Sequence, residues 1–110
     1  MKILLLGGGG LVGNIFIKYF QNCINNHQLG TTFSEGESAY NLKLDKKKTN
    51  TYYNVDAFNY NSILDVINVF NPEAIVNTIG VTKQIANISD SKLSIYLNSY
   101  LPHLLYDTCY

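Results

Sequence analysis

The sequence predicts an α/β fold built on a doubly wound parallel sheet, of which the chain holds the N-terminal portion, about four strands with flanking helices. Short apolar runs alternate with longer segments whose apolar residues recur every three to four positions. This is the pattern of buried strands joined by amphipathic helices. The first run leads straight into four glycines. Because right-handed crossovers lay each helix back on the sheet, such alternation favours parallel strands with helices on both faces.

The expected elements follow one another along the whole chain. Continuous apolar runs and β-branched residues indicate strands, and apolar stripes of helical period indicate helices. The Asn71-Pro72 pair separates the second helix from the next strand, since the residue before a proline disfavours helical geometry. In order, we expect a strand at 3–6, a helix at 11–24, a strand at 29–33, a loop at 34–50, a strand at 51–55, a helix at 62–70, a strand at 74–79 and a helix from 91 to the end.

Composition excludes several classes of partner. Eight lysines balance eight acidic residues and the chain has no arginine, so no basic face is expected for nucleic acid or an anionic membrane. No apolar run approaches the roughly 18 residues that a membrane-spanning helix needs. Glycines interrupt the N-terminal apolar segment and no small-residue cleavage site follows, which argues against a signal peptide. We therefore expect a cytoplasmic protein that binds neither nucleic acid nor membrane.

The two cysteines, Cys23 and Cys109, lie far apart, each inside an apolar helical pattern. We expect both to be reduced core residues, with a disulfide as the alternative. Neither has a second cysteine or a histidine at metal-ligand spacing, so no metal site is expected.

The glycine-rich turn carries the main functional signal. Residues 7–13 read Gly-Gly-Gly-Gly-Leu-Val-Gly and satisfy both G-x-x-G-x-x-G and G-x-G-x-x-G. The turn follows a buried strand and opens a helix, where backbone N–H groups and the helix dipole attract a pyrophosphate. The first glycine allows the tight turn, the middle one lets the backbone approach the phosphates, and the third permits close helix packing. This predicts a Rossmann-type NAD(P)-binding domain; a glycine turn without a ligand is the alternative. The cofactor-binding residues expected here are Gly7, Gly10, Leu11, Val12 and Gly13.

The segment after the second predicted strand bears on the choice between NAD and NADP. An acidic side chain about twenty residues beyond the glycines would bind the adenosine ribose and favour NAD, whereas a basic one would favour NADP. The sequence offers Ser34, Glu35 and Glu37 there, with Lys43 and residues 46–48 further on. We expect Ser34 to contact the cofactor. Glu35 is the acidic candidate, but an exposed loop glutamate explains it as well, so NAD or NADP stays open.

Four segments carry a family resemblance: Lys2-Ile-Leu-Leu-Leu-Gly-Gly-Gly-Gly-Leu-Val-Gly13, Val55-Asp56-Ala57, Pro72-Glu-Ala-Ile-Val-Asn-Thr-Ile-Gly80 and Asn98-Ser-Tyr-Leu-Pro-His103. With these segments the whole chain resembles the N-terminal portion of extended short-chain dehydrogenases/reductases, most closely the dTDP-4-dehydrorhamnose reductase-like, nucleotide-sugar-modifying branch. The resemblance implies an acidic residue near the adenine and a fourth strand whose end lines the cofactor. Those roles fall to Asp56 with Ala57, and to Asn77, Thr78, Ile79 and Gly80. The alternatives are an Asp that caps a helix or closes a turn, and an Asn that ends a strand.

Asn98 matches the helix asparagine of this family, and the resemblance implies that its backbone carbonyl holds a water in the catalytic proton relay. Pro102 lies four residues later. Because proline has no N–H, the helical hydrogen bond to the Asn98 carbonyl cannot form, which predicts a kink. The alternative is a helix that ends near Leu101 and restarts at Pro102 without functional consequence.

The chain departs from the family in two places. None of its eight lysines has a tyrosine four residues earlier, so the Tyr-x-x-x-Lys pair is absent, and residues 81–86 lack the usual Thr-x-Val-Asp-type segment. We therefore interpret residues 1–110 as an incomplete NAD(P)-binding domain that is inactive alone and lacks the catalytic and substrate-binding C-terminal part.

The resemblance implies an NAD(P)H-dependent reductase of a keto group on a nucleotide-linked sugar, with a homodimer as a possible full-length assembly. The alternatives are a non-catalytic NAD(P)-binding regulatory subunit and an epimerase or dehydratase of the same superfamily.

Overall fold

The structure is a computed structural model and describes residues 1–23, 27–40, 49–80 and 95–109. The chain divides into two compact units, Met1–Thr78 and Ile79–Tyr110. Each unit is described by itself.

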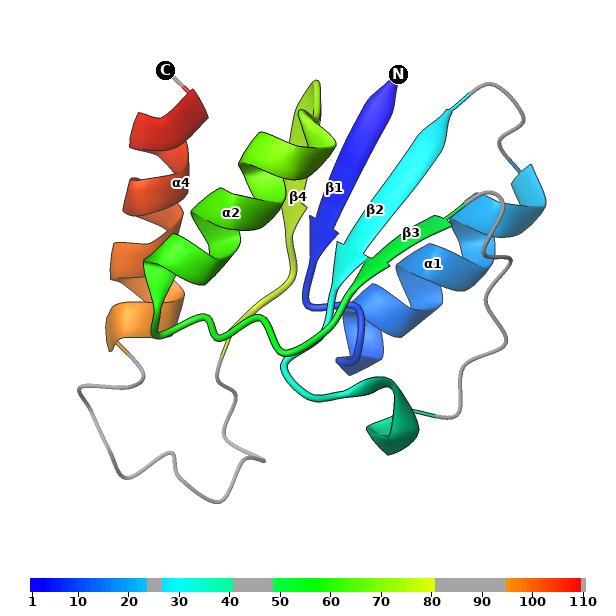
Figure 1. Ribbon diagram of the computed structural model, residues 1–110, viewed down its shortest axis with the longest axis horizontal. Coiled ribbons are helices and arrows are strands. Elements are labelled where there is room, and N and C mark those ends of the chain that lie inside the picture. Colours follow the sequence, from blue (N-terminus) through cyan, green and yellow to red (C-terminus); the bar gives the residue numbers. More distant parts are fainter. Residues whose placement is uncertain (24–26, 41–48, 81–94, 110) are drawn as a thin grey trace. The chain divides into compact units, whose positions relative to one another are not determined.

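The first unit is built on one four-stranded sheet in which every pair of neighbouring strands is parallel (Figure 1). The sheet order is β3-β2-β1-β4. The chain thus runs outward from β1 to β3 and then returns to the other side of β1 for β4. This reversal is the topological switch of a doubly wound sheet and confirms the predicted fold class. The strands are β1 (Lys2–Leu6), β2 (Gln28–Thr32), β3 (Thr49–Tyr52) and β4 (Ala74–Asn77).

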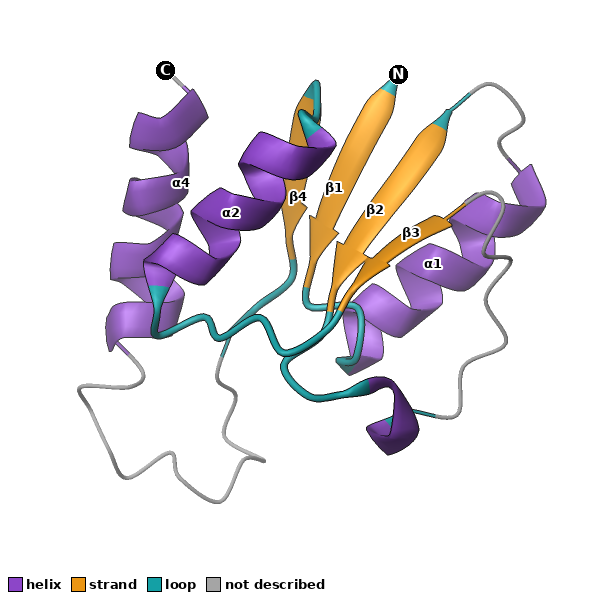
Figure 2. Ribbon diagram, in the orientation of Figure 1, coloured by secondary structure: helices purple, strands orange, loops and turns teal. Residues whose placement is uncertain are grey.

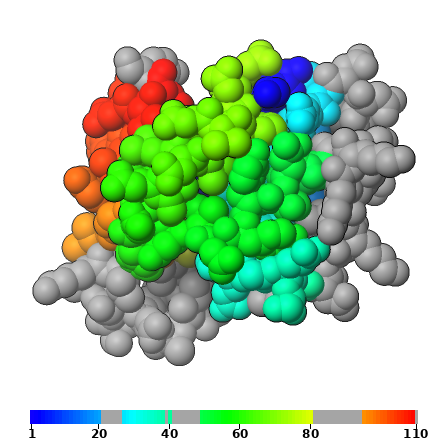
Figure 3. Space-filling view, viewed as in Figure 1, coloured from blue at the N-terminus to red at the C-terminus, as the bar shows by residue number. Residues whose placement is uncertain are grey.

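Helices α1 (Leu11–Cys23) and α2 (Tyr60–Phe70) cover opposite faces of this sheet. Leu29 of β2 belongs to a buried cluster with Ile17 and other residues of α1. A Cβ placed on the next residue, Gly30, would lie 3.0 Å from the ring of Phe70 in α2. Because successive residues of a strand point to opposite faces, the two helices sandwich the sheet. In the space-filling view α2 covers much of the face that is turned toward the reader (Figure 3).

Several predicted boundaries were wrong by two or three residues. Strand β3 spans Thr49–Tyr52 rather than residues 51–55, and α2 begins at Tyr60 rather than at Ser62. Thr49 is buried against the sheet although it is polar, so apolar periodicity could not find it. The predicted loop at 34–50 also contains a short 3₁₀ helix, η1 (Glu37–Ala39). Strand β4 ends at Asn77 rather than at residue 79.

The end of α2 confirms the predicted punctuation. Asn71 adopts a left-handed conformation, with φ of 53°, and its N–H donates to the Ile67 carbonyl at 2.8 Å. Asparagine is one of the few residues that adopt this conformation readily. The helix therefore ends at Phe70, with Asn71 as its cap directly before Pro72.

The described part of the second unit consists of Ile79 and Gly80 and of a helical segment, in which a π-helical turn η2 (Tyr96–Tyr100) is followed by α4 (Leu101–Cys109). Its buried residues recur every four positions at Leu97, Leu101 and Leu105, as the helical period predicted. Residues 91–94 of the predicted helix lie outside the described residues. Cys109 is a free thiol but exposed, so the expectation of a core position was wrong: the stripe of buried leucines ends at Leu105. No helix in the described parts of the chain is long and apolar enough to cross a membrane.

Candidate functional site

The glycine turn joins β1 to α1 and is fixed by hydrogen bonds to β2. Gly7 has a φ of 91°, a conformation that favours glycine because it has no Cβ. Its N–H donates to Oγ1 of Thr32 at 3.2 Å, and the Gly8 N–H donates to the Thr32 carbonyl at 2.9 Å. The Gly10 N–H then donates to the Gly7 carbonyl at 3.1 Å. Gly7 thus makes the tight turn that the glycine spacing predicted.

The glycines of the turn differ in what a side chain would meet. A Cβ on Gly8 would collide with Oγ1 of Thr31, and one on Gly13 would collide with the Gly7 carbonyl. Gly13 therefore provides the predicted close approach of helix to turn. A Cβ on Gly10 would meet only the Gly7 carbonyl, at 3.5 Å, which is ordinary van der Waals contact. The packing of the chain therefore requires Gly8 and Gly13 but does not require Gly10.

The start of α1 fits an anionic group. The Asn14 N–H donates to the Gly10 carbonyl at 2.9 Å, as the first bond of the helix. The N–H groups of Leu11, Val12 and Gly13 precede it and have no acceptor within the helix. Gly10, Leu11 and Val12 are exposed. The helix N-terminus is exposed, and Gly10 places no side chain in front of it. Such an N-terminus suits a pyrophosphate.

Two threonines hold the turn, Thr32 at the end of β2 and Thr78 directly after β4. Thr32 accepts from Gly7 as described above. On the other side of β1, the hydroxyl of Thr78 donates to the Leu6 carbonyl at 2.7 Å and lies 3.3 Å from the Gly7 carbonyl. The sequence analysis did not predict that Thr32 accepts the Gly7 N–H. The alternation of side chains between the two faces of β2 was the signal available for it. Thr78 was predicted to line the cofactor, which stays a prediction, and its side chain positions the turn.

The other predicted residues of the first unit follow the same edge of the sheet. Figure 2 shows that the loops after the four strands all leave from the carboxyl ends of the arrows, at one edge. Ser34 follows β2, Asp56 and Ala57 follow β3, and Asn77 ends β4. In doubly wound sheets this edge holds the ligand, at the switch point that here lies between β1 and β4.

Asp56 has a structural role. Its Oδ1 accepts the Phe58 N–H at 2.9 Å, which closes a turn before α2. The Ser62 hydroxyl donates to the Asn59 carbonyl at 2.7 Å and lies 2.9 Å from the Asp56 carbonyl. The alternative of an Asp that closes a turn is therefore present in the geometry. The side chain is exposed, and contact with an adenine stays a prediction.

Ile79, Gly80 and Asn98 belong to the second unit. A Cβ on Gly80 would lie 3.1 Å from Oδ1 of Asn98, so the structure brings these two predicted site residues together. The absence of a side chain on Gly80 provides the space that the asparagine amide approaches.

The helix around Asn98 has an unusual hydrogen-bond pattern. The Leu101 N–H donates to the Tyr96 carbonyl, a π-helical bond that spans one more residue than in an α-helix. Pro102 supplies no N–H to the Asn98 carbonyl. The helix therefore widens at this turn instead of ending near Leu101 and restarting, as one alternative had it. Single π turns inside helices are frequent at functional sites.

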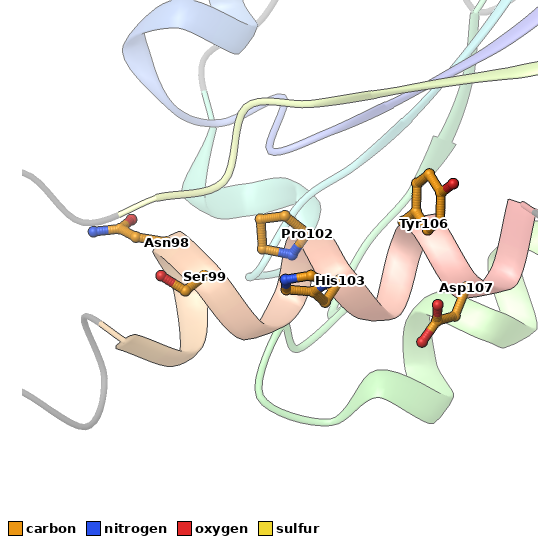
Figure 4. A pocket seen from close by; sticks show the side chains of 6 residues that line it. All are labelled: Asn98, Ser99, Pro102, His103, Tyr106 and Asp107. Atoms are coloured by element: carbon orange, nitrogen blue, oxygen red, sulfur yellow. The ribbon is translucent and has the colours of Figure 1, made fainter.

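A pocket lies along one side of this helix (Figure 4). Its described lining falls in two rows, each with a spacing of four residues, which places the members of a row above one another on the helix surface. His103, Tyr106 and Asp107 were not predicted as site residues. The four-residue spacing was the signal that could have found them, because it links Tyr106 through Pro102 to Asn98, and Asp107 through His103 to Ser99. The described lining residues are Asn98, Ser99, Pro102, His103, Tyr106 and Asp107.

Comparison with models of known protein families finds none that matches the chain, and comparison with curated protein sequences finds no significant match. Solved structures do match. A UDP-Glc/GlcNAc 4-epimerase from Campylobacter jejuni aligns over 98% of this chain with a TM-score of 0.77 and 17% identity. A Thermus thermophilus UDP-glucose 4-epimerase in complex with NAD aligns over 99%, with a TM-score of 0.75 and 14% identity. A Thermotoga maritima UDP-glucose 4-epimerase with UDP-glucose aligns over 97%, with a TM-score of 0.73 and 14% identity.

These likenesses show a Rossmann-type fold, in agreement with the sheet order. The chain spans about a third of the length of each of these structures, 33% in all three cases.

Proposed function

We propose that this chain is the dinucleotide-binding part of an NAD(P)-dependent enzyme of the extended short-chain dehydrogenase/reductase superfamily that acts on a nucleotide-linked sugar. Gly10 carries the proposal. It is an exposed glycine at the start of α1 that neither backbone conformation nor packing requires. A glycine at this position is explained if a phosphate group approaches the backbone closely, because a side chain would block that approach.

The residues of the first unit would divide the binding of the cofactor between them. The N–H groups of Leu11 and Val12 would hold the pyrophosphate, and Ser34 would contact the adenosine ribose. Asp56 and Ala57 would lie near the adenine, with Asn77 lining the cofactor beyond the switch point. When bound, the nicotinamide would supply or accept a hydride. Both NAD and NADP suit this arrangement.

The catalytic pair is the part that this sequence lacks. None of the eight lysines follows a tyrosine by four positions, so we propose that the Tyr-x-x-x-Lys pair and the sugar pocket lie outside residues 1–110. Asn98 would then contribute its carbonyl to a proton relay that the missing tyrosine begins.

Two reactions fit the proposal. The dTDP-4-dehydrorhamnose reductase-like segments of the sequence favour reduction of a keto sugar, whereas the similar structures described above are 4-epimerases. With the full-length protein, net oxidation of NADH or NADPH by a nucleotide-linked keto sugar would indicate the reductase. Interconversion of epimers without net cofactor turnover would indicate the epimerase.

Calorimetric titration of NADH and NADPH against the 110-residue chain tests the binding function. We expect Gly10→Val to abolish binding while the circular dichroism spectrum stays unchanged, because a side chain there blocks the phosphates but meets no protein atom closely. Tyr19→Val is the control, since this residue lies in the same helix, is exposed and belongs to none of the groups proposed to bind the cofactor. Unchanged affinity in Gly10→Val would overturn the assignment of the glycine turn.

Pro102→Ala in the full-length protein tests the role proposed for Asn98. Alanine restores an N–H that can bond the Asn98 carbonyl, so we expect slower turnover with unchanged affinity for NADH. Unaltered turnover would remove the argument for Asn98.

A further inference from the structure

The loop that follows β2 is closed by one side chain. The hydroxyl of Tyr40 accepts the Glu35 N–H at 3.1 Å and shares a hydrogen bond with Oγ of Ser34 at 3.3 Å. The Tyr40 N–H donates to the Glu37 carbonyl at 3.1 Å and ends the 3₁₀ helix η1. Residues 34–40 therefore form a small closed loop whose two ends are joined by the phenol.

The ring of Tyr40 also rests on the glycine turn. A Cβ on Gly9 would overlap Cε1 of this ring and would lie 3.1 Å from Cζ and 3.2 Å from the hydroxyl oxygen. The ring also packs on that of Phe33, with ring centroids 4.7 Å apart. Phe33 in turn stacks on Tyr53, with ring centroids 5.0 Å apart. The phenol thus lies between the turn proposed for the pyrophosphate and the groups after β2.

Those groups are the ones that a bound adenosine would need. In a fold of this kind the residues after the second strand hydrogen-bond the adenosine ribose. Here that position offers the hydroxyl of Ser34 and the N–H of Glu35, and both bond to Tyr40. A phenol hydroxyl, like a ribose hydroxyl, both donates and accepts a hydrogen bond. The two hydroxyls would make the same bonds and cannot make them together.

We propose that Tyr40 is an internal competitor of the cofactor: its phenol occupies the ribose-binding groups in the free chain and must leave them before the adenosine half can bind. The inference rests on the proposed function, since it concerns the same site. If Tyr40 competes in this way, only the fraction of free protein molecules whose phenol has left Ser34 and Glu35 can bind the cofactor. The apparent dissociation constant then exceeds the intrinsic one by the inverse of that fraction.

The test compares two tyrosines of one ring cluster. Tyr40→Phe keeps the ring but removes the hydroxyl that bonds Ser34 and Glu35. Tyr53→Phe is the matched control, because Tyr53 belongs to the same cluster and makes no hydrogen bond to either group. We expect calorimetric titration to show NADH binding to Tyr40→Phe about three- to tenfold more tightly than to the unchanged chain. Stopped-flow mixing should show faster association, and Tyr53→Phe should match the unchanged chain in both measurements.

The outcomes separate this inference from the proposed function. Unchanged or weaker NADH binding in Tyr40→Phe, while the unchanged chain binds, would overturn the inference and leave the cofactor site standing. Equal tightening in Tyr53→Phe would also overturn it, because the effect would then belong to the ring cluster and not to the bonds of Tyr40. Absence of NADH binding in the unchanged chain and in Tyr40→Phe alike would overturn the proposed function together with the inference.

Discussion

Two neighbouring regions at the carboxyl edge of the sheet are held in opposite ways. The glycine turn is fixed by backbone groups and by two buried or half-buried threonines, Thr32 at the end of β2 and Thr78 directly after β4. The loop at residues 34–40 is closed by two solvent-exposed hydrogen bonds of the Tyr40 hydroxyl, to Ser34 and to Glu35. Buried bonds without a competing solvent partner are costly to lose, whereas bonds near water exchange readily. The first region is therefore a fixed platform and the second can be displaced.

The largest effect should come from filling the glycine that the turn itself needs. In Gly13→Val the new Cβ would collide with the Gly7 carbonyl, and backbone atoms cannot yield as a flexible side chain can. We expect the free energy of unfolding, measured by urea denaturation, to fall by about 3 kcal/mol or more. The same change at Gly10 should cost about 1 kcal/mol or less. Equal losses at the two positions would contradict the distinction between a structural and a ligand-directed glycine.

A pair of adjacent threonines gives the next effect. Thr32→Val removes the acceptor of the Gly7 N–H and should lower the free energy of unfolding by about 1–2 kcal/mol. Thr31→Val is the matched control on the same strand: its hydroxyl oxygen is buried without a hydrogen-bond partner. Removing that unpaired group should leave stability unchanged or raise it by up to about 1 kcal/mol. Denaturation curves in which Thr31→Val loses as much as Thr32→Val would show that the turn is not held by this bond.

The smallest effect belongs to the displaceable loop. Tyr40→Phe should lower the free energy of unfolding by only about 1 kcal/mol or less, because its hydroxyl bonds lie near solvent. Amide hydrogen exchange sharpens the comparison: the Glu35 amide should exchange faster in this variant, while the Gly8 amide, bonded to the Thr32 carbonyl, should keep its protection. Faster exchange at both amides would mean that loop and turn open as one unit.

The sequence predicted the sheet and its helices where apolar residues carried the pattern. The run before Gly7 and the stripes of α1 and α2 are dictated by burial, so periodicity identified them. Strand β3 began two residues earlier than predicted because Thr49 and Asn50 are polar and pair through their backbones. Hydrogen bonds between strand backbones form whatever the side chains are, so a hydrophobic pattern does not reveal them.

The site was predictable only where the backbone constrains residue type. The spacing of the glycines revealed the conformational role of Gly7 and the packing role of Gly13. The tasks of Thr32, Thr78 and Tyr40 depend on which strand ends meet in space, and a threonine or tyrosine suits many other places equally well. Tyr40 lies 31 residues from the glycine on which its ring rests, a contact that only the folded chain defines.

Backbone amide NMR of the 110-residue chain during titration with NADH tests the central claim most directly, because it reports where the cofactor binds. The account predicts that the largest chemical-shift changes fall on the amides of Gly10, Leu11 and Val12, with a second group at Ser34 and Glu35 as the phenol of Tyr40 leaves. Saturable changes confined to other parts of the chain, with the amides of the turn unmoved, would contradict it.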